Sequence, residues 1–289
     1  MGNMWAVKVI RKDKGYDYDM SWRMLMREHE LLQKLSSHPN IINSLGMDLN
    51  GSLDCNEKSE SIVYNVLEFA KNGVLSYYIR HTGAIEESIS KFFALQIWSA
   101  IEFIHSQGYC HLDIKLDNIL LDEYFNIKMA DMGSSIDVSE SQGYTDRRRG
   151  TYNYMAPEVA NLEKGQEFDA YAADIYSLGV TLYIMLTAEF PRKEHIENDF
   201  STSECYNDTN FEQMSNEDWP KTKKWDLLSF NIRQLLKSMM SHDPNSRPSI
   251  NEVLNHKWLS YDFDHSRPSI VYEEMLWRKE YASQYQLKH

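Results

Sequence analysis

Apolar side chains in the first part of the chain follow two different periods. In residues 3–10 they alternate, which predicts a β-strand with Lys8 on the same face as Ala6 and Ile10. In residues 20–35 they recur every three or four positions, which predicts an amphipathic helix. The chain is therefore expected to open with a strand followed by a helix.

One charged residue interrupts each of these two elements. Lys8 lies in the half-buried strand, where a lysine costs free energy unless it meets an anion or reaches water. Glu28 lies inside the apolar stripe of the predicted helix. Either Glu28 sits at the margin of that stripe, or it pairs with Lys8 so that each charge offsets the burial of the other.

Further along the chain, the pattern changes from strands to helices. Residues 50–60 are expected to form a polar connection, and residues 61–70 a strand that leads into a turn at Asn72 and Gly73. Helical periodicity then predicts helices at residues 88–107, 174–186, 225–241, 249–259 and 270–285. The expected fold class is α+β, with a small strand-rich lobe and a larger helical lobe.

The same change of pattern predicts the domain organisation. We expect the first lobe at residues 1–70, the second at residues 71–261, and a tail with one helix at residues 262–289. The junction of the lobes is a natural place for a ligand cleft. Within the second lobe, residues 134–157 are expected to form a polar loop that is either functional or disordered, and the acidic stretch at residues 192–224 is assigned no chemistry.

Composition and charge narrow the classes of function. The 289 residues include 43 acidic and 30 basic side chains, and the net charge of −13 argues against non-specific binding to nucleic acid or anionic membranes. Cys55, Cys110 and Cys205 are far apart, so neither a disulfide framework nor a zinc site is indicated. The apolar run at residues 175–186 is expected to be a buried core helix, too short and too polar to span a bilayer. With no signal peptide apparent, we expect a cytoplasmic protein, with the nucleus as an alternative.

Residues 111–133 carry the most informative cluster of polar side chains. Asp113, Lys115 and Asn118 precede a short apolar run, and Asp131 follows a second one. Carboxylate and amide oxygens are ligands that Mg²⁺ prefers, a lysine neutralises phosphoryl charge, and a free carboxylate can hold an incoming hydroxyl. The cluster therefore predicts a site for a magnesium–phosphate complex.

Several segments, taken in chain order, resemble the eukaryotic protein kinase catalytic domain over residues 4 to 260. They are AVKVI, REHELLQKLSSHPNI, VLEFAKNG, HLDIKLDNILL, ADMG, GTYNYMAPE, DIYSLGVTLYIML and DPNSRP. Lys115 and the segment GTYNYMAPE resemble the serine/threonine class. The resemblance implies a bilobal fold, ATP and Mg²⁺ as substrate and cofactor, and protein hydroxyls as acceptors.

The resemblance also implies a nucleotide site between the lobes. Lys8 matches the lysine that holds the α- and β-phosphates, and Glu28 matches its partner on the neighbouring helix. The residues expected around the adenine are Ala6, Leu67, Glu68, Ala70 and Leu120.

The catalytic roles fall on the cluster at residues 111–133. Asp113 matches the aspartate that orients the substrate hydroxyl, and Lys115 matches the lysine that neutralises the γ-phosphate. Asn118 and Asp131 match the two magnesium ligands. Supporting roles are implied for Thr151, which bonds Asp113 and Lys115, for an ion pair of Glu158 with Arg247, and for Asp174 beneath the catalytic loop.

The sequence departs from the family pattern at several points. Only seven residues precede Lys8, so the glycine-rich loop that covers the phosphates in the family is missing; we expect an incomplete chain, the alternative being a lobe that binds nucleotide without this cover. Leu112 replaces an arginine that grips a phosphorylated activation loop, which implies activity that is constitutive or gated differently. Smaller departures are Leu116, Met132 and Val74.

A second class of function remains open at this point. A non-catalytic kinase-fold binding module would also carry this pattern, and the missing glycine-rich loop favours it, whereas the presence of Lys8, Asp113, Asn118 and Asp131 favours an enzyme. A small-molecule kinase is disfavoured because the segment around GTYNYMAPE serves protein substrates in the family. The expected partners are ATP and protein substrates, and the sequence does not predict the oligomeric state.

Overall fold

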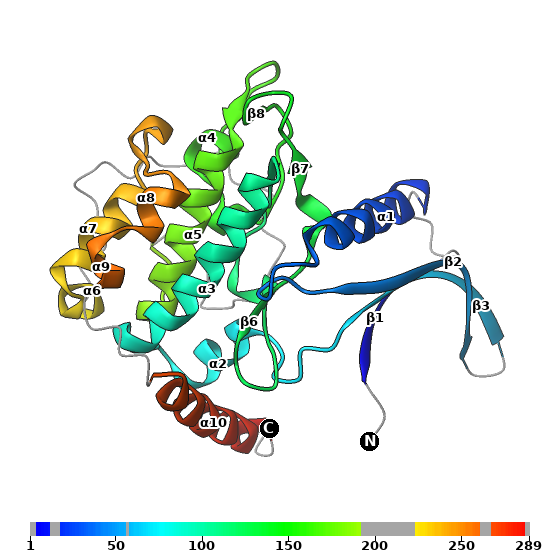
Figure 1. The fold of residues 1–289 in the computed structure, drawn as a ribbon, viewed down its shortest axis with the longest axis horizontal. Helices are drawn as coiled ribbons and strands as arrows, with labels where there is room; N and C mark the ends of the chain where they lie inside the picture. The colour runs from blue at the N-terminus through cyan, green and yellow to red at the C-terminus, as the bar shows by residue number, and fades with distance from the viewer. Residues whose placement is uncertain (1–3, 12–17, 56–57, 192–222, 261–266, 287–289) are drawn as a thin grey trace.

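The computed structural model describes residues 4–11, 18–55, 58–191, 223–260 and 267–286, and Figure 1 shows the fold. The chain forms a small strand-rich lobe and a larger helical lobe, joined near residue 70. This α+β, bilobal arrangement confirms the predicted fold class. The lobe boundaries at residues 70 and 261 remain predictions.

The small lobe is an antiparallel sheet with one helix on its face. The sheet has the strand order β1-β3-β2, so β3 lies in the centre. Its elements are β1 (Trp5–Arg11), α1 (Tyr18–Leu35), β2 (Ser44–Cys55) and β3 (Lys58–Glu68). Helix α1 buries Leu31, Leu32 and Leu35, which explains the period of three to four in its sequence.

Pairing between β1 and β3 determines which side chains face α1. Lys8 lies opposite Asn65, and Ala6 lies opposite Leu67. Because side chains alternate along a strand, Ala6 and Lys8 share the face turned toward α1, and Val7 lies on the outer face. The predicted orientation of Lys8 is therefore the one found.

The predicted polar connection at residues 50–60 is wrong for most of its length. Residues 44–55 and 58–68 form β2 and β3, which pair as a long ribbon that extends away from the helical lobe. Much of this ribbon is exposed, so it needs no apolar face, and its sequence therefore lacks the alternation that identifies a half-buried strand.

The helical lobe is built around α5 (Ala170–Thr187), which packs against α3 (Glu87–Ser106) and α7 (Phe230–Met239). Helix α5 is 18 residues long, longer than the predicted 174–186, and by length and composition it could cross a membrane. However, 89% of the helix is buried within the fold. Burial on all sides explains its continuous apolar sequence and makes it the core helix that we predicted.

Shorter elements complete this lobe. They are α2 (Leu75–Thr82), α4 (Pro157–Ala160), α6 (Lys223–Leu227), α8 (Ile250–Leu254), α9 (Lys257–Ser260), and the 3₁₀ turns η1 (Leu116–Asn118), η2 (Met132–Ser134), η3 (Tyr152–Tyr154) and η4 (Pro244–Ser246). Three small strand pairs accompany them: β4 (Tyr109–Cys110) with β7 (Ile136–Asp137), β5 (Ile119–Leu121) with β6 (Ile127–Met129), and β8 (Tyr144–Thr145) with β9 (Phe168–Asp169).

Two predicted helices are each divided in two. The predicted helix at residues 225–241 is α6 and α7, because Ser229 caps a new helix by accepting a hydrogen bond from the Ile232 N–H. The predicted helix at residues 249–259 is α8 and α9, and α8 begins with a capping box formed by Ser249 and Glu252. Most of the acidic stretch at residues 192–224 lies outside the described residues.

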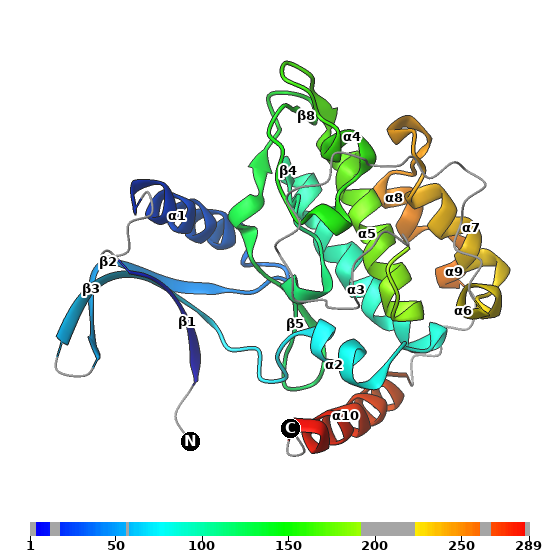
Figure 2. The same cartoon turned by 180° about the vertical axis from the view of Figure 1, so that it is seen from behind.

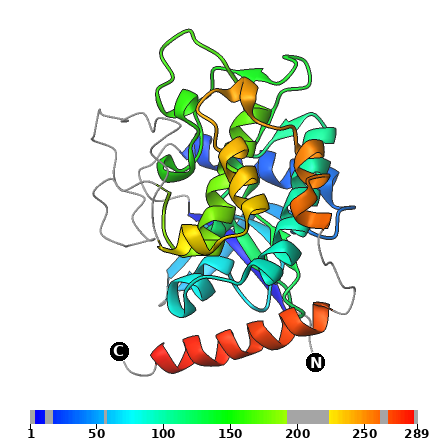
Figure 3. The same ribbon diagram turned by 90° about the vertical axis from the view of Figure 1, so that its left-hand side faces the viewer.

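The last helix, α10 (Arg267–Gln286), packs against α2 at the edge of the helical lobe (Figure 3). Val271, Met275 and Ala282 are buried in this contact, whereas Trp277 remains half-exposed. The helix predicted at residues 270–285 is thus present and packs on the domain.

Candidate active site

Three side chains form the centre of the site. Asp113 and Lys115 lie in the loop after α3, and Thr151 lies just before η3. The Lys115 ammonium donates to Asp113 Oδ2 at 2.9 Å and to Thr151 Oγ1 at 2.7 Å. The Thr151 hydroxyl in turn donates to Asp113 Oδ1 at 2.7 Å. Each oxygen of the Asp113 carboxylate therefore has a fixed donor, which sets its orientation.

Asn118 lies beside this cluster, at the end of η1. Its Nδ2 donates to the Asp113 carbonyl oxygen at 2.7 Å and to Asp113 Oδ2 at 3.2 Å. Because both donations use the amide nitrogen, Oδ1 is the atom of Asn118 that can accept or ligate. Asn118 is buried, and this orientation turns its oxygen away from Asp113.

Asp174 fixes the backbone of the loop from below. Its carboxylate, fully buried in α5, accepts the N–H groups of His111 and Leu112, each at 2.8 Å. Leu112 has a φ of 60°, a left-handed conformation that costs free energy for a branched residue. The two charge-assisted hydrogen bonds hold the loop in this conformation.

A glycine allows the polar loop at residues 134–157, the activation segment, to approach the loop that carries Asp113. Gly150 has a φ of 102°, and a Cβ there would lie 2.1 Å from the Leu112 carbonyl oxygen. Only glycine fits both the conformation and the distance. This close approach places the neighbouring Thr151 within hydrogen-bond reach of Asp113.

Lys8 reaches across from the small lobe. Its ammonium lies 2.7 Å from Glu28 Oε2 and 2.9 Å from Asp131 Oδ1, so it joins β1, α1 and the loop before η2. Glu28 is 2% exposed, whereas the side chain of Asp131 is 47% exposed. The lysine thus bridges one buried and one accessible carboxylate.

The surroundings change the pKa values of these three groups in different directions. Burial raises the pKa of Glu28, and the attraction of Lys8 only partly offsets this effect. Burial also opposes the charge of Lys8, but the Glu28 and Asp131 carboxylates outweigh it and raise the pKa of the ammonium. For Asp131, burial would raise the pKa, yet the Lys8 charge outweighs it and the pKa is lowered.

The residues expected around an adenine lie along the junction of the lobes. Ala6 and Leu67 are opposite one another on β1 and β3. Leu120 is half-buried across the junction and pairs with Val74 through an isolated bridge. Glu68 and Ala70 belong to the connecting segment, where the Glu68 carboxylate is held by Lys128 at 2.7 Å.

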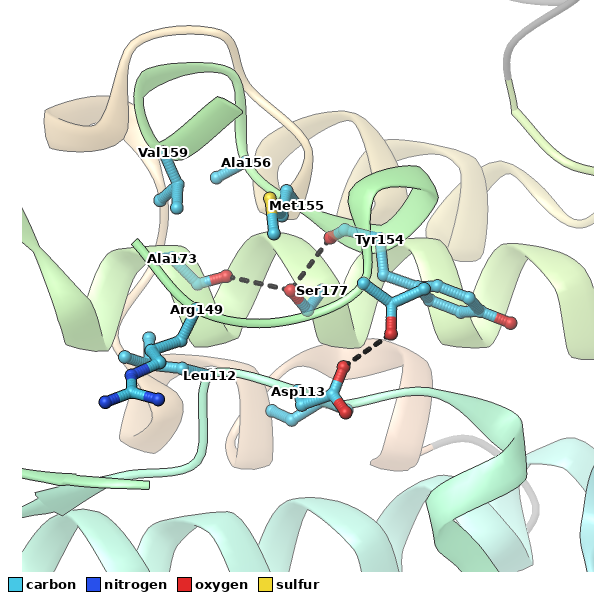
Figure 4. A pocket seen from close by; sticks show the side chains of 11 residues that line it. Leu112, Asp113, Arg149, Tyr154, Met155, Ala156, Val159, Ala173 and Ser177 are labelled. Atoms are coloured by element: carbon cyan, nitrogen blue, oxygen red, sulfur yellow. Dashed lines mark hydrogen bonds between the residues drawn. The ribbon is translucent and has the colours of Figure 1, made fainter. Parts of the chain in front are cut away.

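A small pocket borders Asp113 on the side of the activation segment (Figure 4). Leu112 and Asp113 line one side of it, and Met155, Ala156 and Val159 line the other. Ser177 of α5 ties the segment down by donating to the Tyr154 carbonyl oxygen at 2.8 Å. The pocket is therefore mainly apolar and lies next to a fixed carboxylate.

An ion pair connects the end of this segment to the last part of the lobe. Arg247, whose side chain is fully buried, donates to both carboxylate oxygens of Glu158 at 2.6 and 2.7 Å. It also donates to the carbonyl oxygens of Ala172 and Ser241. The predicted pair is thus present and braces α4 against α5.

The departures from the family pattern are accommodated within the apolar core. Leu112 is 7% exposed, Leu116 is fully buried, and Met132 is 2% exposed beside α1. Apolar side chains of this size fill these positions without leaving a polar group unpaired.

Sequence reasoning missed several residues that hold the site together. Lys128 at the hinge is one; others are Ser76, which donates to Asp117 of the catalytic loop, and the polar side chains His29, Ser44 and Asn65 behind α1. Apart from His29, which lies in the segment REHELLQKLSSHPNI, none of these lies in a motif, and each is an ordinary polar residue when it is read alone.

Comparison with known proteins shows the family. The family model of the protein kinase domain matches residues 1–259, and the chain belongs to this family. The cell cycle serine/threonine-protein kinase CDC5/MSD2 of Saccharomyces cerevisiae is 31% identical over 276 residues, which cover 94% of this chain and 35% of that protein.

Two further relatives are also serine/threonine kinases by name. CBL-interacting serine/threonine-protein kinase 15 of Arabidopsis thaliana is 29% identical, with 94% of this chain and 59% of that protein covered. Serine/threonine-protein kinase CHK1 of Saccharomyces cerevisiae is 30% identical, with 88% of this chain and 45% of that protein covered. The chain thus spans between about a third and three fifths of the length of these relatives.

Proposed function

We propose that the protein is a serine/threonine kinase that transfers the γ-phosphoryl group of ATP to hydroxyl groups of protein substrates. The observation that carries the proposal is the pair of polar clusters that face each other across the junction of the lobes. One holds Asp113 between Lys115 and Thr151, and the other holds Lys8 between Glu28 and Asp131. The serine/threonine kinases among its relatives support the same class.

Each side chain has a distinct task in this proposal. Lys8, held by Glu28, meets the α- and β-phosphates. Asp113 orients the incoming hydroxyl and accepts its proton, and Lys115 neutralises charge on the transferred group. Thr151 is hydrogen-bonded to both Asp113 and Lys115 and fixes their positions relative to one another.

The residues present fit a magnesium ion. The hydrogen bonds from Asn118 to Asp113 use the amide nitrogen, so its amide oxygen can ligate an ion. Asp131 offers an accessible carboxylate, and its lowered pKa keeps it ionised. Hard oxygen atoms of this kind suit Mg²⁺. When bound, the ion would neutralise charge on the phosphates. These two residues would hold it.

The adenine and the protein substrate would lie on either side of these clusters. We propose that Ala6, Leu67 and Leu120 contact the adenine ring, and that backbone groups of Glu68 and Ala70 bond its edge. The apolar pocket beside Asp113 would take a side chain next to the acceptor residue of the substrate.

We further propose that activity does not require phosphorylation of the activation segment. Leu112 is apolar and buried, so it offers no positive charge to a phosphate group. Thr145, close to the three arginines at residues 147–149, is the candidate phosphorylation site in this segment. A Thr145→Ala variant should therefore keep most of its turnover. Loss of nearly all turnover in that variant, with recovery in Thr145→Asp, would contradict this proposal.

A binding module without catalysis is the alternative to this proposal. All four residues that such modules commonly lose, Lys8, Asp113, Asn118 and Asp131, are present, and hydrogen bonds pair Lys8 with Asp131 and Asn118 with Asp113. No observation among the described residues favours the alternative.

The experiment that tests the function follows the label from ATP. The full-length protein is incubated with Mg²⁺, γ-labelled ATP and a generic basic protein, and the product is hydrolysed for phosphoamino-acid analysis. We expect phosphoserine and phosphothreonine, and no label when Mg²⁺ is chelated. Labelling of tyrosine alone, or no labelling of any residue, would contradict the proposal.

A further inference from the structure

A chain of hydrogen bonds, buried at its sheet end, connects α1 to the sheet behind the Lys8–Glu28 pair. His29 Nδ1 lies 2.6 Å from Ser44 Oγ, and the Ser44 hydroxyl donates to Asn65 Oδ1 at 2.6 Å. Ser44 is 4% exposed and Asn65 is fully buried. One turn further along α1, Gln33 donates through Nε2 to the Ser44 carbonyl oxygen. We call His29, Ser44 and Asn65 the back-wall triad.

The direction of these hydrogen bonds is fixed by the number of protons available. A serine hydroxyl has one proton, and the proton of Ser44 is used toward Asn65 Oδ1. Ser44 Oγ can therefore only accept from His29, so Nδ1 of the imidazole carries a proton. The helix thus donates to the sheet at this point, and a side chain without a donor in the place of Nδ1 cannot make the contact.

The two ends of the triad adjoin the two members of the ion pair. His29 is the residue after Glu28 on α1, and Asn65 lies directly opposite Lys8 across β1 and β3. The triad thus connects α1, through Ser44 of β2, to the residue of β3 that lies opposite Lys8. A rotation or translation of α1 that breaks one set of contacts must disturb the other.

The apolar contacts of α1 do not specify this position to the same degree. Leu31, Leu32 and Leu35 bury the helix against the domain, but burial of apolar area is non-directional. Hydrogen bonds, by contrast, lose strength steeply with distance and angle. The triad is thus the contact that defines the rotation of α1 about its own axis.

Stability alone does not explain why Asn65 is present. Its Nδ2 is buried without a hydrogen-bond partner among the described residues, and an unsatisfied buried donor is destabilising. An apolar side chain of similar size would remove this cost. The feature that an apolar residue cannot supply is the acceptor that orients the Ser44 hydroxyl.

We propose that His29, Ser44 and Asn65 are positioning residues for phosphoryl transfer, because they fix the rotation of α1 at which Glu28 holds Lys8 in place. This inference rests on the proposed kinase activity and adds residues that act through the ion pair. It predicts that loss of the triad affects Lys8 before it affects the stability of the fold.

The test compares variants of the full-length protein that remove or keep the donor and the acceptor. His29→Leu removes the donor, whereas His29→Asn places an amide N–H near the position of Nδ1. Asn65→Leu removes the acceptor together with the unsatisfied donor. Glu30→Leu, at an exposed neighbour of His29 on α1, is the matched control for an apolar substitution.

The first readout is independent of activity. The acylation rate of Lys8 by an amine-reactive reagent is measured by mass spectrometry, because an ammonium held by carboxylates reacts slowly. We expect His29→Leu and Asn65→Leu to raise this rate several-fold, and His29→Asn and Glu30→Leu to leave it near the wild-type value. An unchanged rate in His29→Leu and Asn65→Leu would overturn the proposal.

The second readout is turnover together with thermal stability. In His29→Leu and Asn65→Leu we expect kcat to fall about tenfold or more, since a displacement on the order of 1 Å at a positioning group has effects of this size. Asn65→Leu should keep or raise the unfolding temperature while it loses kcat. A merely structural triad would instead lower kcat only in proportion to stability, or would show no rescue in His29→Asn.

The two readouts separate this proposal from the proposed function. A protein that transfers no phosphoryl group at all, but whose Lys8 becomes reactive in His29→Leu, would contradict the kinase activity and support the positioning role. Transfer that persists unchanged in both apolar variants would contradict the positioning role and leave the kinase activity standing.

Discussion

Lys8 illustrates how a single residue connects sequence, structure and chemistry. Its place in an alternating strand required a partner, and the structure contains two, Glu28 and Asp131. Glu28 is buried, and the loss of hydration disfavours its charged form. Asp131 is accessible and remains available to a metal ion. The same side chain thus offsets the burial of one carboxylate and orients another.

A Lys8→Met variant should lose more stability near neutral pH than in mild acid. The raised pKa of Glu28 means that its charge costs stability as the pH rises through that value, and removal of Lys8 raises the pKa further. Asp131 also loses the charge that lowers its pKa, and this loss likewise matters only where Asp131 is ionised. The measurement is the unfolding temperature of wild type and variant between about pH 5 and about pH 7.5.

The control for this prediction is the double variant Lys8→Met with Glu28→Gln, which removes the uncompensated carboxylate. It should be more stable than Lys8→Met alone at neutral pH. A difference from wild type that grows as the pH falls would contradict the account of the Lys8 site.

Helix α10 shows how one element supports the cleft without contributing to it. Arg278, 4% exposed, donates to Thr82 Oγ1 at 2.5 Å and to the carbonyl oxygens of Gly83 and Ala84. Lys279 donates to Asn72 Oδ1 at 2.6 Å, at the start of the segment that leads into α2. The helix therefore holds α2 at both ends.

Replacement of Arg278 by alanine should destabilise the helical lobe by about 2 kcal/mol or more, because buried carbonyl oxygens lose charged donors. Thermal unfolding and hydrogen exchange in α2 measure the effect. Glu280→Ala, at an exposed position on the same helix, should change stability by less than about 0.5 kcal/mol. Equal effects of the two substitutions would show that α10 does not brace α2.

The elements differ in how far the sequence predicted them. The amphipathic and fully buried helices were predictable because their apolar period is set by the core that they face, as in α1 and α5. Strand β2 and the first residues of β3 were not, since this exposed part of the ribbon lacks an apolar face, whereas the strand expected at residues 61–70 covers the rest of β3. Helix α2 was not predicted. Helices α6 and α7 were predicted as one helix, because the Ser229 cap between them is a weak signal inside a periodic stretch.

The candidate site shows a similar division. Asp113, Lys115, Asn118 and Asp131 lie in short segments whose order resembles a known family, so they could be named from the sequence. The back-wall triad could not, because His29, Ser44 and Asn65 are far apart in the chain and meet only when α1 packs on the sheet. Contacts that depend on tertiary packing leave no local pattern.

At the scale of the whole molecule, the outer face of the sheet is unusual. β1 is an edge strand of the described sheet, and its outward side chains Trp5, Val7 and Val9 are 50%, 54% and 38% exposed. An exposed apolar edge strand can pair with a strand of another chain.

We therefore expect the protein to associate with itself at high concentration, and a Val7→Lys variant to associate less. Sedimentation velocity over a range of concentrations measures the effect. Ser52→Lys, at an exposed position of β2, adds the same charge away from this face and should leave the association unchanged. Equal reductions in both variants would assign the effect to net charge, and a wild-type protein that is monomeric throughout would contradict the expectation.

The central claim is that the carboxylate of Asp113, fixed by Lys115 and Thr151, is the group that acts on the substrate hydroxyl. The most direct measurement is kcat for phosphoryl transfer by the full-length Asp113→Asn variant, with Glu123→Gln as the matched control at an exposed carboxylate. The account predicts that kcat falls by about a hundredfold or more in Asp113→Asn, as expected for loss of a general base. It predicts no change in Glu123→Gln. Transfer by Asp113→Asn at the wild-type rate would contradict the account.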